Sequence, residues 1–197
     1  MYETLRRLCR EHPEHKHYNE VSAKLWIIAR TYATQIERKV SSDGSQGSSL
    51  ATIAETLLKH GEEIDELLNH VSANAERLCD DLLPSIFRVH GALVQLLKPI
   101  TGGSNVRSFA SKYLHFHRPA VPIYDSVALS NLRKLVRWTP DLECDASAPE
   151  GDDEYRWFVL RLRRLNQRAR SEGLDPTVRD LDWYLLSAGD APAAPVT

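Results

Sequence analysis

Apolar residues recur along this chain every three or four positions, the spacing that places them on one face of an α-helix. Proline, glycine and short polar stretches divide this pattern into segments. The pattern predicts helices over residues 2–11, 19–40, 50–59, 62–83, 85–97, 104–117, 126–138, 155–170 and 177–188. We therefore expect an all-α fold, a helical bundle in a single domain over residues 1–188, followed by a disordered Ala/Pro-rich tail over 189–197.

Two adjacent glycines open the most informative stretch of the chain. Gly102, Gly103 and Ser104 precede a predicted helix, and their backbone N–H groups suit a phosphate or another anion. Two prolines end this helix, and Asp125 or Ser126 is the expected N-cap of the next one. The sequence therefore predicts an anion-binding turn followed by a carboxylate at a helix start.

The order of these features resembles the helix-hairpin-helix DNA glycosylase superfamily. The shared pattern is a Gly-rich turn, a helix with Phe-Ala-x-Lys, a Pro-x-x-Pro sequence, an apolar pair and an aspartate before a helix. The helical, Cys-poor character is most similar to the 8-oxoguanine DNA glycosylases, including the archaeal type. The resemblance implies a glycosylase-like fold with its helix-hairpin-helix region at residues 99–138.

The resemblance also implies a DNA-binding role for the hairpin. In this superfamily, backbone amides of the hairpin bind DNA phosphates. The corresponding DNA-binding residues here are Gly102, Gly103, Ser104, Asn105 and Arg107.

Asp125 corresponds to the catalytic aspartate of the superfamily and Lys112 is a second candidate for chemistry. Bifunctional members carry a lysine at the start of the helix after the hairpin, where this chain has Val106 or Arg107. We therefore expect a monofunctional enzyme, because an aspartate that activates water does not need that lysine. The alternatives are that Asp125 is only a helix cap and Lys112 only a solvated helix residue.

Three further residues are candidates for the substrate pocket. Trp26 could stack on an extruded base, and Tyr113 and His115 lie on the helix that follows the hairpin. The alternative for the surface around Trp26 is a rim salt bridge between Arg30 and Glu37, which lie on the same helical stripe.

The histidines near the N-terminus allow a different interpretation. His12, His15 and His17 lie around Pro13, which interrupts a helix, so a solvated polar loop is favoured over a metal site. The spacing of Arg10 and His15 resembles that of helical, toxin-like ribonucleases, although Pro13 again breaks the shared helix face. We expect no metal at these residues.

Composition adds few constraints on function. The chain has 197 residues, 42% of them hydrophobic, and a formal net charge of −2, so any nucleic-acid surface requires segregated charge. The three cysteines lack a Cys-x-x-Cys spacing, which indicates neither a disulfide framework nor a zinc site. No nucleotide-binding fingerprint or membrane-spanning run is present, so we expect a monomeric cytoplasmic protein without a cofactor or membrane partner.

Together these observations predict a DNA glycosylase that acts on double-stranded DNA carrying a modified base. It would extrude the base and hydrolyse its N-glycosidic bond, leaving an abasic site, in base excision repair or in anti-phage defence. Two alternatives are a non-catalytic helix-hairpin-helix module that only binds DNA and a toxin-like ribonuclease that depends on Arg10 and His15.

Overall fold

The computed structural model describes residues 1–32, 34, 36–40, 49–139, 142 and 152–187. Within these ranges the chain is helical and contains no strand, which confirms the predicted all-α class. The elements in order are α1 (Tyr2–Glu11), α2 (Tyr18–Thr31), α3 (Ile36–Lys39), α4 (Ser49–Lys59), α5 (Gly61–Asn69), the 3₁₀ turn η1 (Asp80–Leu82), α6 (Leu83–Leu97), α7 (Arg107–His117), α8 (Ser126–Leu135), α9 (Asp153–Ser171) and α10 (Val178–Ser187). The predicted tail over 189–197 lies outside the described residues.

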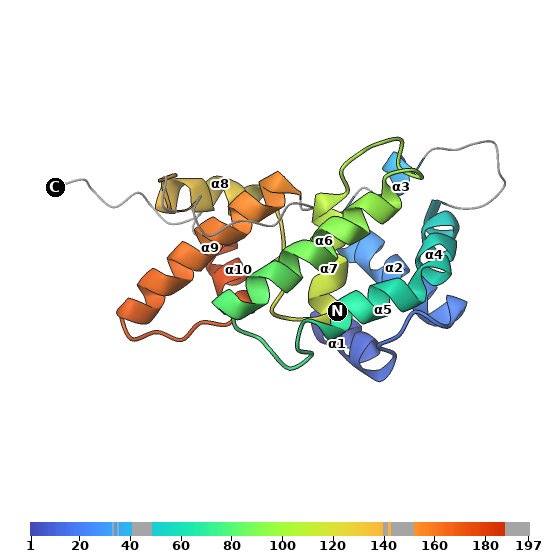
Figure 1. Ribbon diagram of the computed structural model, residues 1–197, viewed down its shortest axis with the longest axis horizontal. Coiled ribbons are helices and arrows are strands. Elements are labelled where there is room, and N and C mark those ends of the chain that lie inside the picture. The colour runs from blue at the N-terminus through green and yellow to red at the C-terminus, as the bar shows by residue number, and fades with distance from the viewer. Residues whose placement is uncertain (33, 35, 41–48, 140–141, 143–151, 188–197) are drawn as a thin grey trace.

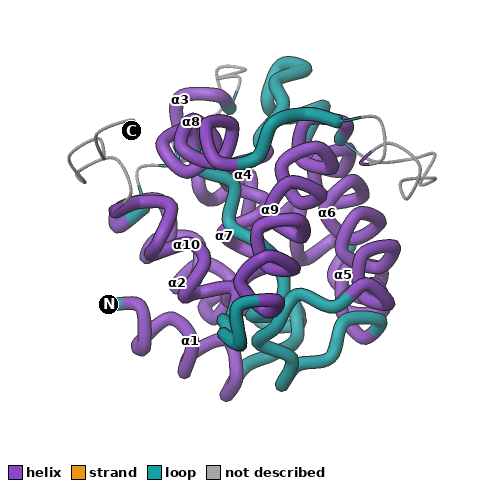
Figure 2. The backbone as a smooth tube through the Cα atoms, turned by 90° about the vertical axis from the view of Figure 1, so that its left-hand side faces the viewer, coloured by secondary structure: helices purple, strands orange, loops and turns teal. Residues whose placement is uncertain are grey.

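The helices are arranged around α7, which is the most deeply buried of them. All of its residues from Phe109 to His117 are buried, and they include polar as well as apolar side chains. Helices α1, α2 and α6 all pack against α7. Helices α8, α9 and α10 gather at one end of the molecule and α2 to α5 at the other (Figure 1). Figure 2 shows α7 behind α9, in the interior of the bundle.

The predicted helix over 19–40 is interrupted in the structure. Helix α2 ends at Thr31, and α3 begins only at Ile36. The carbonyl oxygen of Tyr32, the C-cap of α2, accepts a hydrogen bond from Lys112 Nζ at 3.2 Å. Because a side chain of α7 donates a hydrogen bond to this carbonyl, the helix can end here without leaving the carbonyl unpaired.

The predicted helix over 62–83 is also shorter, and its second half is irregular. Helix α5 ends at Asn69, where Arg118 Nε donates to the carbonyl oxygen of Leu68 at 2.8 Å. Further along, Asn166 Nδ2 donates to the carbonyl oxygen of Leu78 at 3.1 Å. Side chains from distant helices thus provide the hydrogen bonds that a longer helix would have made within itself.

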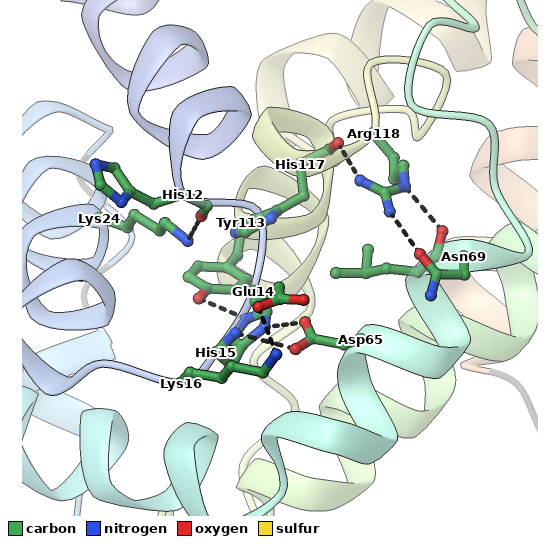
Figure 3. Close-up of polar contacts among 11 residues, drawn as sticks. His12, Glu14, His15, Lys16, Lys24, Asp65, Asn69, Tyr113, His117 and Arg118 are labelled. Atoms are coloured by element: carbon green, nitrogen blue, oxygen red, sulfur yellow. Dashed lines mark hydrogen bonds and ion pairs between the residues drawn. The ribbon is translucent and has the colours of Figure 1, made fainter.

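His15 is buried, so the expectation of a solvated polar loop is wrong for this residue. Its Nδ1 lies 2.6 Å from Asp65 Oδ1 and its Nε2 lies 2.9 Å from the hydroxyl oxygen of Tyr113 (Figure 3). These distances suit an Nδ1–H that donates to the carboxylate and an Nε2 that accepts from the hydroxyl. The contact ties the loop between α1 and α2 to both α5 and α7.

The packing of this loop predicts that Gly61→Ala destabilises the protein by about 1–3 kcal/mol. A Cβ at Gly61 would lie 2.6 Å from the carbonyl oxygen of His15, and this backbone atom cannot move without disturbing the His15 contacts. Chemical denaturation measures the change, with Glu62→Ala on the exposed side of the same turn as the control. Equal stability of the two variants would contradict the prediction.

Candidate functional site

The chain between α7 and α8 is buried although it is not helical. Residues 118–124 are all buried, so their backbone polar groups need partners inside the protein. The carbonyl oxygen of Val121 accepts from His115 Nδ1 at 2.9 Å, and that of Pro122 accepts from the hydroxyl of Tyr155 at 2.8 Å. Helices α7 and α9 thus hold this segment from two sides.

The same segment positions Asp125. The backbone N–H of Tyr124 donates to Ser111 Oγ at 2.9 Å in a buried contact with α7. Asp125 follows directly and is the N-cap of α8, with Oδ1 accepting from the backbone N–H of Val127 at 2.8 Å. This confirms the predicted capping role and fixes the orientation of the carboxylate.

Lys112 lies beside Asp125, with 3.7 Å between Nζ and Oδ2. It is only 6% exposed, so the alternative of a solvated helix lysine is wrong. Its ammonium also donates to Ser108 Oγ at 3.1 Å and to the carbonyl oxygen of Tyr32 at 3.2 Å. Burial lowers the pKa of Lys112, and the negative charges of Asp125 and Asp182 oppose part of that effect.

Lys112 and Asp125 line one open cavity of about 570 Å³. The cavity lies where the end of α2 and the middle of α7 face α10. The charged and aromatic groups among the described residues of its wall are those of Tyr32, Lys112, Asp125, Arg179, Asp182 and Trp183. Its size falls within the range of about 300–1,000 Å³ that is typical of small-molecule sites.

Helix α10 contributes three of these side chains, and the sequence analysis identified none of them as functional. Asp182 is buried and pairs with Arg179 at 2.8 Å. Burial raises the pKa of Asp182 to about 6, and the charge of Asp125 adds to the rise. Trp183 is 61% exposed at the cavity. The sequence signal for this group was the helical spacing of Arg179, Asp182 and Trp183.

The turn between α6 and α7 uses two of the predicted phosphate-binding amides internally. The N–H of Gly103 donates to the carbonyl oxygen of Lys98 and that of Ser104 to the carbonyl oxygen of Thr101, both at 3.0 Å. Gly102 and Gly103 have φ of 57° and 78°, the left-handed region that favours glycine. The two glycines therefore close the turn after α6, and the amides of Gly103 and Ser104 are engaged within it.

Arg107 is paired with acidic groups rather than free for a phosphate. Its Nε lies 2.7 Å from Asp152 Oδ1 and its Nη1 lies 2.9 Å from Glu154 Oε2. Asn105 is the remaining residue predicted to bind DNA here. Its backbone carbonyl oxygen accepts a hydrogen bond from Lys39 Nζ at 3.2 Å. The structure thus gives Arg107 a structural contact with the start of α9.

Two of the three residues predicted for the substrate pocket are core residues. The hydroxyl of Tyr113 contacts His15, and His115 Nε2 lies 2.8 Å from the hydroxyl oxygen of Tyr2. Both side chains have no exposed surface, and burial lowers the pKa of His115 to about 4. They are therefore closed to a substrate because α1 and the loop after it cover them.

Trp26, the third predicted pocket residue, lies on the outer surface of α2. It is 57% exposed and is not among the described residues that line the cavity. The nearby Arg30 and Glu37 form an ion pair at 3.6 Å, which confirms the rim salt bridge on this surface.

The described residues contain no group of three or more His, Cys, Asp or Glu side chains arranged to hold a metal ion. Within the same ranges, no helix has the length and apolar character needed to cross a membrane.

Ser111→Ala should lower the free energy of unfolding by about 1–3 kcal/mol, because it leaves the buried N–H of Tyr124 without its acceptor. Urea denaturation measures the loss. Ser130→Ala makes the same chemical change on the exposed side of α8 and should stay within about 0.5 kcal/mol of the unaltered protein. A neutral effect of Ser111→Ala would show that the segment before Asp125 is not held by this contact.

Asp182→Asn should change the pH dependence of stability. The folded-state pKa of about 6 exceeds the unfolded value of about 3.9. Between these two pH values the folded state therefore binds more protons than the unfolded state. As pH rises through this range, the ionisation of Asp182 lowers the stability of the unaltered protein. The stability of the variant relative to the unaltered protein should therefore rise by roughly 2 kcal/mol from about pH 4 to pH 7. Thermal unfolding at several pH values measures it.

Asp180→Asn is the control of opposite sign, because hydrogen bonds from Thr177 lower the pKa of Asp180. As pH rises through the acidic range, the stability of Asp180→Asn relative to the unaltered protein should fall instead of rise. Parallel pH profiles for Asp182→Asn and the unaltered protein would contradict the assignment of a raised pKa.

Comparison with known proteins gives one match. The HI_0787_N family, described as an N-terminal domain, matches residues 2–121. The matched region contains α1 to α7 with Lys112, and it ends before Asp125 and α8. No curated protein and no solved structure matches the chain. Because the match covers more than half of the sequence, the chain belongs to the HI_0787_N family.

Proposed function

We propose that this protein is a DNA glycosylase that hydrolyses the N-glycosidic bond of a modified base in double-stranded DNA. The observation that supports this most is the pair of Lys112 and Asp125, 3.7 Å apart in the wall of an open cavity. A base that is rotated out of the duplex needs a concave site of this kind, next to a group that acts on its sugar. The resemblance of residues 99–138 to helix-hairpin-helix glycosylases points to the same chemistry.

Asp125 is the proposed catalytic residue. Its carboxylate orients or deprotonates the attacking water and offsets the positive charge that develops on the sugar as the bond breaks. The hydrogen bond from the backbone N–H of Val127 holds the carboxylate in one orientation, so little reorganisation is needed during the reaction.

Lys112 has an electrostatic role in this proposal. Its ammonium has three acceptors around it, which are Ser108 Oγ, the carbonyl oxygen of Tyr32 and the carboxylate of Asp125. An amine held in this way serves to orient the carboxylate rather than to attack the sugar. We therefore propose a monofunctional reaction that stops at the abasic site.

The aromatic residues in the cavity wall suit a planar base. Trp183 and Tyr32 provide aromatic surface, and aromatic side chains stack on bases that have left the duplex. The carboxyl group of Asp182, whose pKa is raised to about 6 by burial, can form a hydrogen bond with the edge of the base. An oxidised purine is the base that the resemblance implies, and a bulky modified cytosine is the alternative if the enzyme serves in defence.

Asp125→Asn should reduce base release by about 100-fold or more while DNA binding is retained, because the amide cannot take a proton or offset positive charge. The assay uses duplexes that each carry one modified base and measures the released base by mass spectrometry. A duplex with the base already removed reports DNA binding in the same preparation.

Asp81→Asn is the matched control, since it makes the same change at an exposed position on the 3₁₀ turn. It should release base at the rate of the unaltered protein. Undiminished release by Asp125→Asn would refute the catalytic role, and binding without release from any substrate would indicate a module that only binds DNA.

A further inference from the structure

A second cavity lies between α8 and α9, apart from the one that contains Lys112 and Asp125. It has a volume of about 340 Å³ and is lined by Leu129, Arg133, Trp138, Glu154, Trp157 and Arg161. Two arginines and two tryptophans lie together in this small cavity, and neither the family match nor the proposed reaction assigns it a role.

The aromatic residues hold one of these arginines in place. The rings of Trp138 and Trp157 meet edge to face with their centroids 4.3 Å apart. The guanidinium carbon of Arg161 lies 5.1 Å from the centroid of the Trp138 ring, a cation–π arrangement. Such a contact orients the guanidinium without neutralising its charge.

Neither arginine of this cavity forms an ion pair with a described residue. Arg133 lies close enough to Arg161 to lower the pKa of Arg161, in addition to the larger effect of burial. Arg161 Nε is buried without a hydrogen-bond partner among the described residues. The one carboxylate in the cavity wall, that of Glu154, is already engaged by Arg107 at 2.9 Å and by the hydroxyl of Tyr124 at 2.5 Å. Two neighbouring guanidinium groups without an acidic partner favour an anion between them.

The position of this pair relative to Asp125 indicates which anion. Asp125 caps α8, and Arg133 lies two turns further along the same helix, about 12 Å away at the usual rise of an α-helix. A separation of this order spans a few nucleotides of one DNA strand. A strand with one nucleotide in the first cavity can therefore extend toward Arg133 and Arg161.

We propose that Arg133 and Arg161 bind a backbone phosphate of the DNA strand that flanks the extruded nucleotide. This inference rests on the proposed function for its choice of DNA as the ligand. The proposed phosphate-binding surface is the groove between α8 and α9. It is not the turn between α6 and α7, where two amides are engaged internally. Arg133 and Arg161 supply affinity and register, and Trp138 positions Arg161.

The test measures binding of undamaged duplex DNA by fluorescence anisotropy at several salt concentrations. Each phosphate contact that is lost reduces the slope of log K against log salt concentration by about one. The double variant Arg133→Gln/Arg161→Gln should therefore bind more weakly, with a slope smaller by about one, because both side chains contact the same phosphate. Arg133→Gln alone changes only an exposed side chain and should also weaken binding and reduce the slope, even if the double variant folds poorly.

Arg7→Gln/Arg10→Gln is the matched control, because it removes the same charge from a different arginine-lined surface, on α1. Its slope should equal that of the unaltered protein. Unchanged slopes in the Arg133 and Arg161 variants, an equal loss in the control, or tighter binding of the corresponding RNA duplex would each overturn the proposal.

Failure of the proposed function gives a different result. If the unaltered protein releases no base but the slopes still differ as expected, the phosphate site stands without the chemistry. If base is released, the double variant should need a higher DNA concentration for half-maximal release, because it binds DNA more weakly.

Discussion

The buried hydrogen bonds of residues 118–124 are the constraint on which the rest of the site depends. This segment crosses the interior without forming a helix, so every backbone group in it that lacks a partner would cost about 1–3 kcal/mol. Ser111 and His115 of α7 and Tyr155 of α9 provide partners, and Arg118 reaches back to the end of α5. One conformation of the segment satisfies these groups together, and Asp125 is placed by it.

Helix ends complete the electrostatics of the cavity. The ammonium of Lys112 meets the C-terminal end of α2, where the helix dipole favours a cation, and the carboxylate of Asp125 lies at the N-terminus of α8, where it favours an anion. Each charge is therefore stabilised by a helix end, in addition to the attraction between Lys112 Nζ and Asp125 Oδ2 at 3.7 Å. The burial of Lys112 and Asp182 costs stability, because it removes their charged forms from water.

The cavity lies at a junction within the chain. Tyr32 and Lys112 belong to the region that matches the HI_0787_N family, whereas Asp125, Asp182 and Trp183 follow it. Helix α10 packs on α8, so the groups that follow the matched region form one unit that closes the cavity from the other side. The chemistry proposed for this protein requires both parts, because neither contains the ammonium and the carboxylates together.

Local interactions let the sequence by itself determine the all-α class, the bounds of α1 and the capping role of Asp125, since these depend on residues only a few positions apart. Lys112 and Asp125 were each predicted as candidate residues from the sequence, but only the structure shows that they lie 3.7 Å apart. Only the tertiary structure decided that Lys112 is buried, that Arg107 pairs with Asp152 and that Trp183 is exposed at a cavity. Their partners come from helices far apart in the sequence, and hydrophobic periodicity does not specify which helices meet.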